Sequence, residues 1–166
     1  MRHVISVLVE NKFGVLAKIA GLFSGRGFNI DSLSVGETMD PSVSRMTIVT
    51  RGDDKILEQV NKQLNRLVDV IKVQDFIDKE YVERELVLIK VGVGPKERAE
   101  VLEVADIFRA KIIDVSPHSV TLEVTGSGGK ISAIIDLLRP YKIQELVRTG
   151  RVAIARGEKT LRSEKE

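Results

Sequence analysis

Apolar residues change their spacing along the first half of the chain, and each change predicts the boundary of an element. Over residues 2–9 apolar and polar side chains alternate, which predicts a strand with one buried face. After Gly14 the apolar residues recur every three to four positions, so we expect an amphipathic helix over 14–25. Asp53 or Asp54 can cap a second helix. The remaining predicted strands are 28–37, 44–50 and 68–73. The residues expected on the buried face of the first helix are Val15, Leu16, Ile19, Leu22 and Phe23.

The same order of elements recurs after the highly charged segment QDFIDKEYVERE. Strands are predicted at LVLIKV, KIIDV, VTLEVT and RVAIAR. One helix is predicted over GPKERAEVLEVADIF, with Pro95 in its first turn, and another over residues 130–138. The stretch from Tyr141 to Val147 is ambiguous between helix and strand.

Two consecutive β-α-β-β-α-β units predict an α+β protein made of two ferredoxin-like domains, each a four-stranded sheet with two helices on one face. A chain of 166 residues is long enough for two such small domains. The expected boundaries are a first domain over 1–76, a linker over 77–85, a second domain over 86–157 and a flexible tail over 158–166. Because this fold supports many unrelated functions, the function must be inferred from sites.

Composition narrows the class of protein. The absence of cysteine excludes disulfides and thiolate metal sites, and no apolar run approaches the length of a membrane span. The N-terminal stretch is strand-like and lacks a cleavage site, so we expect a cytoplasmic protein without a membrane anchor. Residues 1–76 carry ten Lys and Arg against nine Asp and Glu, a balance that argues against nucleic-acid binding.

The motifs most suggestive of catalysis or metal binding lack residues that those functions require. TGSGGK departs from the phosphate-loop pattern at its first glycine and at the residue after its lysine, so a flexible turn explains it better. His3 and His118 have no accompanying cluster of ligand residues. A small phosphatase would need a catalytic arginine in the first strand–helix loop, which offers only Lys12. We therefore expect no catalytic residues and no metal site.

The stretch ENKFGVLAKIAGLFSGRGFNI holds the best candidate site. Gly14 stands where a capping side chain is usual, so the backbone N–H groups of Val15 and Leu16 are open to a carboxylate at the positive end of the helix dipole. Asn11 and Asn29 can accept from an ammonium group without adding charge. A free amino acid fits this chemistry. On the residues alone, a loop glycine at Gly14 and turn-forming asparagines explain the stretch slightly better.

The same stretch resembles an ACT domain, a module that senses amino acids. Over residues 1–76 the patterns ENxxGVLxRIxGLFSxRGFNIxSLxV and SRMTIV resemble the regulatory small subunits of acetohydroxyacid synthase, also called acetolactate synthase; Lys18 stands where the pattern has arginine. The resemblance extends over essentially the whole chain, through RELVLIKV and GRVAIARG, but it is less distinctive in the second half.

This resemblance implies a non-catalytic regulatory subunit that activates a separate catalytic subunit and confers feedback inhibition by valine, in some members also by leucine or isoleucine. Thiamine diphosphate, magnesium and flavin would belong to the catalytic subunit alone. The resemblance also implies a homodimer in which ACT domains pair side by side and bind the effector at their interface. The loop around Met39 and Asp40 is a candidate contact with the catalytic subunit. The effector-binding residues carried over are Asn11, Gly14, Val15 and Leu16 of one chain with Asn29 and Ile30 of its neighbour.

Two alternatives remain open from the sequence. The chain could be a free-standing amino-acid-binding regulator of another enzyme, which would not co-purify with a synthase. It could also be a small ferredoxin-like hydrolase, which an assay of phosphate-ester or acyl-phosphate cleavage would reveal.

Overall fold

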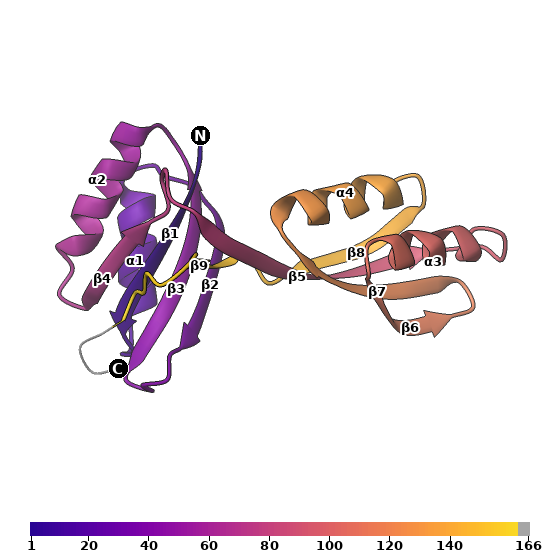
Figure 1. The fold of residues 1–166 in the computed structure, drawn as a ribbon, viewed down its shortest axis with the longest axis horizontal. Helices are drawn as coiled ribbons and strands as arrows, with labels where there is room; N and C mark the ends of the chain where they lie inside the picture. Colours follow the sequence, from indigo (N-terminus) through magenta and orange to yellow (C-terminus); the bar gives the residue numbers. More distant parts are fainter. Residues whose placement is uncertain (163–166) are drawn as a thin grey trace. The chain divides into compact units, whose positions relative to one another are not determined.

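The computed structural model describes residues 1–162 and divides the chain into two compact units. One unit combines residues 1–82 with the C-terminal residues from Arg151 onward, and the other spans Glu83–Gly150. Each unit contains its own antiparallel sheet and its own pair of helices (Figure 1). The predicted fold class, with the β-α-β-β-α-β order occurring twice, is confirmed.

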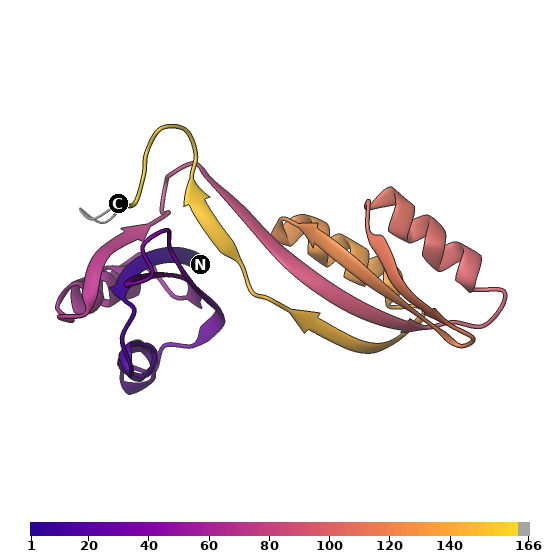
Figure 2. The same cartoon turned by 90° about the horizontal axis from the view of Figure 1, so that it is seen from below.

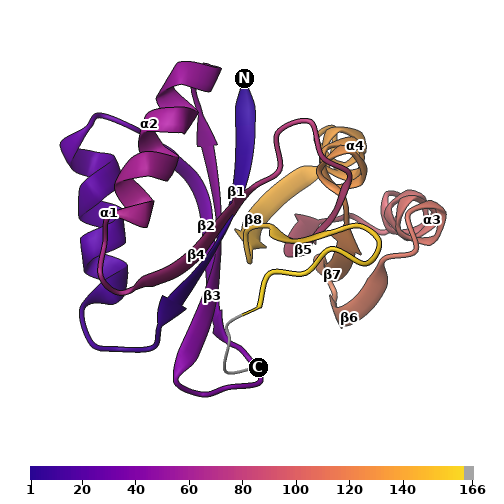
Figure 3. The ribbon, with the colours of Figure 1, turned by 60° about the vertical axis from the view of Figure 1, so that its left-hand side comes forward.

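The first unit places both of its helices on one face of a four-stranded sheet, as Figure 3 shows. The strand order is β2-β3-β1-β4, so β2 lies at an edge of the sheet. The elements are β1 (Arg2–Glu10), α1 (Val15–Gly25), β2 (Ile30–Glu37), β3 (Val43–Arg51), α2 (Asp54–Asn65) and β4 (Val70–Asp75).

The core between this sheet and its helices follows the predicted periodicity, with one exception. Successive strand residues point to opposite faces, so Ile5, Val7 and Val9 meet the helices and are buried. Asp53 caps α2, because its side chain accepts a hydrogen bond from the backbone N–H of Ile56 at 2.8 Å. The buried residues of α1 are Val15, Ile19 and Phe23. Leu16, predicted on the buried face, is instead 46% exposed.

The C-terminal strand β9 (Val152–Ala155) covers the opposite face of the same sheet. Ala153 packs there against Val4, Val49 and Phe76. Figure 2 shows β9, in yellow, beside the first part of strand β5 (Tyr81–Gly92), with which it pairs. The backbone N–H of Arg156 donates to the carbonyl of Glu80 at 3.1 Å and extends this pairing.

Arg45 on β3 ties the C-terminal strand to the sheet that it covers. Its Nε donates to Ser6 Oγ at 2.8 Å, and its Nη2 donates to the carbonyl oxygen of Ala153 at 3.0 Å. Ser6 is fully buried and Thr47 beside it is 4% exposed, so this layer of the core is partly polar.

The second unit repeats the arrangement, with α3 and α4 on one face of a sheet in the order β6-β7-β5-β8 (Figure 1). Its core is aliphatic and is contributed mainly by β5, β7, α3 and α4. The remaining elements are α3 (Arg98–Ile107), β6 (Lys111–Ser116), β7 (Ser119–Gly126), α4 (Gly128–Leu138) and β8 (Lys142–Arg148).

Two expected boundaries of the second domain were wrong. RVAIAR was expected as its last strand; β9 does pair with β5 of the second sheet, but it is grouped with the first unit, and the ambiguous stretch forms the strand β8 on the other side of β5. The linker expected over 77–85 is shorter, because β5 already begins at Tyr81. Helix α3 begins at Arg98, so Pro95 precedes it. Part of the expected flexible tail, residues 163–166, lies outside the described residues, and its flexibility stays a prediction.

Candidate functional site

The loop between β1 and α1 is fixed to the loop that joins β2 and β3. The backbone N–H of Asn11 donates to the carbonyl of Ser42 at 2.8 Å. The side-chain Nδ2 of Asn11 donates to the carbonyl of Pro41 at 2.9 Å and to Glu37 Oε1 at 3.2 Å. The amide hydrogens of Asn11 therefore face protein acceptors, and its Oδ1 is the group suited to accept a hydrogen bond from a ligand.

Gly14 immediately precedes α1 in a left-handed conformation, with φ 83° and ψ −6°. This conformation by itself favours glycine, while a Cβ at this position would meet nothing within 4 Å. Gly14 offers no capping side chain, and the first turn of α1 contains no acidic residue. The N–H of Val15 lies 3.4 Å from the carbonyl oxygen of Lys12, a long hydrogen bond. The amino end of α1 therefore keeps donors and a positive dipole end for a carboxylate.

Charge around this loop is balanced within the protein. Lys12 lies 2.5 Å from Glu10, and Lys18 lies 2.7 Å from Asp69. The hydrogen bond to Glu10 raises the pKa of the Lys12 ammonium, and the hydrogen bond from Lys18 lowers the pKa of Asp69. Since these cations already have carboxylate partners, the loop suits a neutral zwitterion better than an anion with several charges.

Asn29 and Ile30 lie at the other end of the same sheet. Ile30 pairs with Thr50, which pairs with His3 near the start of β1, whereas the Asn11 loop follows the end of β1. One chain therefore does not bring all six predicted site residues together. Asn29 Nδ2 donates to Asp31 Oδ1 at 3.1 Å.

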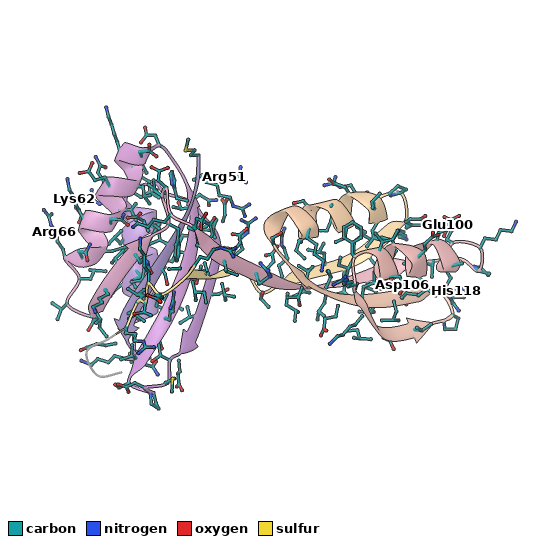
Figure 4. The ribbon with its side chains drawn as sticks, in the orientation of Figure 1. Arg51, Lys62, Arg66, Glu100, Asp106 and His118 are labelled. Atoms are coloured by element: carbon teal, nitrogen blue, oxygen red, sulfur yellow. The ribbon has the colours of Figure 1, made fainter. Side chains whose placement is uncertain are left out.

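Asp31, which accepts the hydrogen bond from Asn29, also forms an ion pair with Arg51. Asp31 Oδ2 accepts from Nε of Arg51 at 2.6 Å, and Figure 4 shows Arg51 at the edge of the first unit. This hydrogen bond is the main reason that the pKa of Asp31 lies below its usual value, and the bond from Asn29 acts in the same direction. The orientation of Asn29 therefore rests on an ionised Asp31.

Two residues that orient Asn11, Glu37 and Pro41, were missed by the sequence reasoning. Glu37 ends β2 and Pro41 lies in the following loop, 26 and 30 residues from Asn11, a separation that no local pattern encodes.

The rejected motifs have structural explanations. His3 is buried, with Nε2 3.0 Å from the carbonyl oxygen of Gly52. His118 lies in the turn between β6 and β7, where Figure 4 labels it. Lys130 of TGSGGK donates to the carbonyl of Thr125 at 3.0 Å. Within residues 1–162 no group of three or more His, Cys, Asp or Glu side chains could hold a metal ion, and the lack of a bound metal stays a prediction.

Comparison with known protein families matches the two halves of the chain separately. A family model described as the AHAS small subunit-like ACT domain matches residues 5–72, and one described as the small subunit of acetolactate synthase matches 84–157. A probable acetolactate synthase small subunit of Archaeoglobus fulgidus is 58% identical over 159 residues, which are 96% of this chain and 99% of that relative. The chain belongs to the acetolactate synthase small-subunit family.

Other members of the acetolactate synthase small-subunit family agree with this assignment. The small subunit of Haemophilus influenzae is 47% identical over 97% of this chain and 99% of its own length. A crystal structure of the small subunit from Thermotoga maritima has a TM-score of 0.86 and 44% identity, and it covers 95% of this chain and 99% of that one. As a small subunit, the chain is a regulatory component of the synthase. Within the described part, no helix is long and apolar enough to cross a membrane.

Proposed function

We propose that this small subunit activates the thiamine-diphosphate-dependent catalytic subunit of acetolactate synthase and makes it subject to feedback inhibition by valine. The chain itself would carry no cofactor, and thiamine diphosphate, magnesium and flavin would be held by the catalytic subunit in the cytoplasm. The open amino end of α1, between Gly14 and Leu16, is the observation that carries this proposal.

A homodimer through strand β2 would complete the effector site. As an edge strand, β2 has one side of its backbone available for pairing with a second copy. Antiparallel pairing about its midpoint sets Ile30 of one copy opposite Glu37 of the other. Because Glu37 accepts from Asn11, this pairing brings Asn29 and Ile30 of one chain towards the Asn11 loop of its neighbour.

Each part of valine then has a complementary group. The carboxylate would accept hydrogen bonds from the backbone N–H groups of Val15 and Leu16, and the ammonium would donate to Asn11 Oδ1. The isopropyl group would pack against the half-exposed side chain of Leu16 and against Ile30 of the neighbouring chain. Because Leu16 stays exposed in a single chain, burying it in this complex adds a hydrophobic contribution.

Feedback inhibition requires that valine bind one arrangement of the dimer better than another. Allosteric couplings are typically about 1–3 kcal/mol, which corresponds to changes in activity of about 5-fold to 150-fold. An effector shared between two chains is suited to such coupling, because a change in how the chains pair alters both halves of the site at once.

Reconstitution tests the proposal directly. The purified chain should form no acetolactate from pyruvate when thiamine diphosphate and magnesium are added, but it should raise the turnover of the purified catalytic subunit. Valine should then lower that turnover, and calorimetry should detect valine binding to the small subunit alone. A chain that binds valine but neither associates with the synthase nor alters its turnover would instead be a regulator of another enzyme.

A further inference from the structure

A groove of about 670 Å³ lies on the face of the first sheet that is turned away from α1 and α2. It is formed within the first unit, between the β2–β3 loop and the C-terminal segment. We infer that this groove is the docking site for an acidic segment with apolar side chains on the catalytic subunit. The inference rests on the proposed function for the existence of that partner.

Several apolar side chains in or beside this groove are highly exposed to solvent. Met39 at the tip of the β2–β3 loop is 97% exposed, and Ile154 on β9 is 56% exposed. Strand β9 turns Ala153 inward, so its outward positions, Val152 and Ile154, present branched side chains to solvent. Prominent apolar residues beside a groove are typical of protein interfaces.

The charge of the groove defines the chemistry of the partner. Among residues 1–162, its lining includes the cationic residues Arg45, Lys159 and Arg162 and one carboxylate, that of Glu37. Such a surface attracts an acidic segment and repels a basic one. Leu8 contributes a buried apolar floor, so an apolar anchor flanked by carboxylates would complement both features.

The exposed residues favour a protein over a small molecule as the occupant. Val152 is exposed and does not line the groove, so a ligand confined to the groove would leave it in solvent, whereas a docking segment that extended past the rim would cover it. A stable interface buries about 1,200–2,000 Å² in total, so the groove would form its centre and not its whole extent.

The groove is physically continuous with the candidate valine site. Glu37 lines the groove and also accepts the hydrogen bond from Asn11 at 3.2 Å. A partner seated in the groove would contact the loop that orients Asn11, and valine would act on the same loop from its other side. Chains of packed or hydrogen-bonded groups can carry coupling of this kind, and Glu37 forms one such link between the groove and Asn11.

The test compares variants of the full chain for binding to the purified catalytic subunit by biolayer interferometry. The double variant Met39→Glu/Ile154→Glu should weaken binding at least tenfold, and the charge reversal Lys159→Glu/Arg162→Glu should also weaken it. Val68→Glu is the matched control, since Val68 is 94% exposed in the turn before β4, and it should change binding less than twofold. Thermal melting followed by circular dichroism and calorimetric titration of valine should give wild-type values for all variants.

Each outcome separates the inference from the proposed function. If the wild-type chain does not bind the catalytic subunit, both fail. If the wild type binds and the Met39/Ile154 double variant binds equally well, the docking site is wrong and the proposed function stands. Unchanged subunit binding together with lost self-association in ultracentrifugation would assign the groove to a second copy. Unchanged subunit binding together with loss of bound 8-anilinonaphthalene-1-sulfonate would assign it to a small organic anion.

Discussion

The two units share one order of elements but treat the amino ends of their helices differently. In the second unit, Glu97 accepts from the N–H of Gly94 at 3.0 Å just before α3, and Glu83 lies 3.4 Å from the N–H of Gly128 at the start of α4. In the first unit α2 is capped by Asp53, whereas α1 begins after Gly14 with no carboxylate of its own. The second unit thus supplies its own carboxylates near the amino ends of its helices, whereas α1 of the first unit leaves its amino end for the proposed effector.

Supplying α1 with a carboxylate should remove this difference. We expect Gly14→Asp to lower valine affinity about a thousandfold, because two carboxylates about 4 Å apart repel by roughly 4 kcal/mol at an effective dielectric near 20. Aspartate tolerates the left-handed conformation better than most residues, so the fold should survive. Calorimetry measures the affinity, and assays of the reconstituted synthase should show activation preserved.

Gly14→Asn is the matched control for this charge. Asparagine is similar in shape and also tolerates positive φ, but it is neutral. Valine affinity in Gly14→Asn should therefore exceed that in Gly14→Asp by a large factor. Equal loss in both variants would mean that the conformation of Gly14, and not an open helix end, determines binding.

Separate cores should let each unit be destabilised alone. Ile89 on β5 and Ile5 on β1 are both fully buried, each in the core of its own unit. Truncation to alanine typically costs about 2–5 kcal/mol, so we expect a loss of about 3 kcal/mol in each case. Ile89→Ala should leave the affinity for the proposed effector valine unchanged at 25 °C, while Ile5→Ala should lower the stability of the first unit. Urea unfolding followed by tryptic cleavage of each unit distinguishes them; parallel loss in both units would indicate a single cooperative structure.

Removing the cap of α2 should have a smaller effect. Asp53→Ala leaves the N–H of Ile56 without its side-chain acceptor. Loss of an N-cap typically costs about 1 kcal/mol of unfolding free energy. Denaturant titration measures it, and Glu58→Ala, at an exposed position of the same helix, serves as the control. Equal effects of both substitutions would rule out a specific contribution of the cap.

The smallest expected effect concerns Asp31, whose pKa the Arg51 hydrogen bond lowers. A carboxyl group with a lowered pKa in the folded state stabilises the fold above its unfolded pKa, and this contribution is lost as pH falls through the folded value. Because Arg51 is largely exposed, we expect Asp31→Asn to cost less than about 1 kcal/mol at pH 7. The difference in unfolding free energy between Asp31→Asn and the wild type should shrink below about pH 4. A difference that persists at pH 2 would point to packing instead of charge.

Local patterns predicted the helices and most strands, because the side-chain period encodes which face is buried. Asp53 is an example, since its capping role depends on residues three positions away. The packing of RVAIAR against the first unit could not be predicted, because an alternating strand fits the face of either sheet equally well. Strand β8 was ambiguous because it shows little alternation of burial. Of the six candidate site residues, four lie in the β1–α1 loop and the first turn of α1, but the position of Asn29 and Ile30 depends on the register of β2 against β3. Leu16 was wrongly predicted to be buried, because the spacing of apolar residues identifies a helix face but not how far other elements cover that face.

The return of β9 to the first unit has a consequence for synthesis of the chain. A nascent chain emerges at about 5–20 residues per second, and amino-terminal domains generally fold first. Here the face formed by Val4, Val49 and Phe76 receives its cover from Ala153, which is made after the whole second unit. The first unit made is therefore the last to be finished, and during that interval its apolar rear face is open to chaperones, to a second nascent copy, or to a partner subunit.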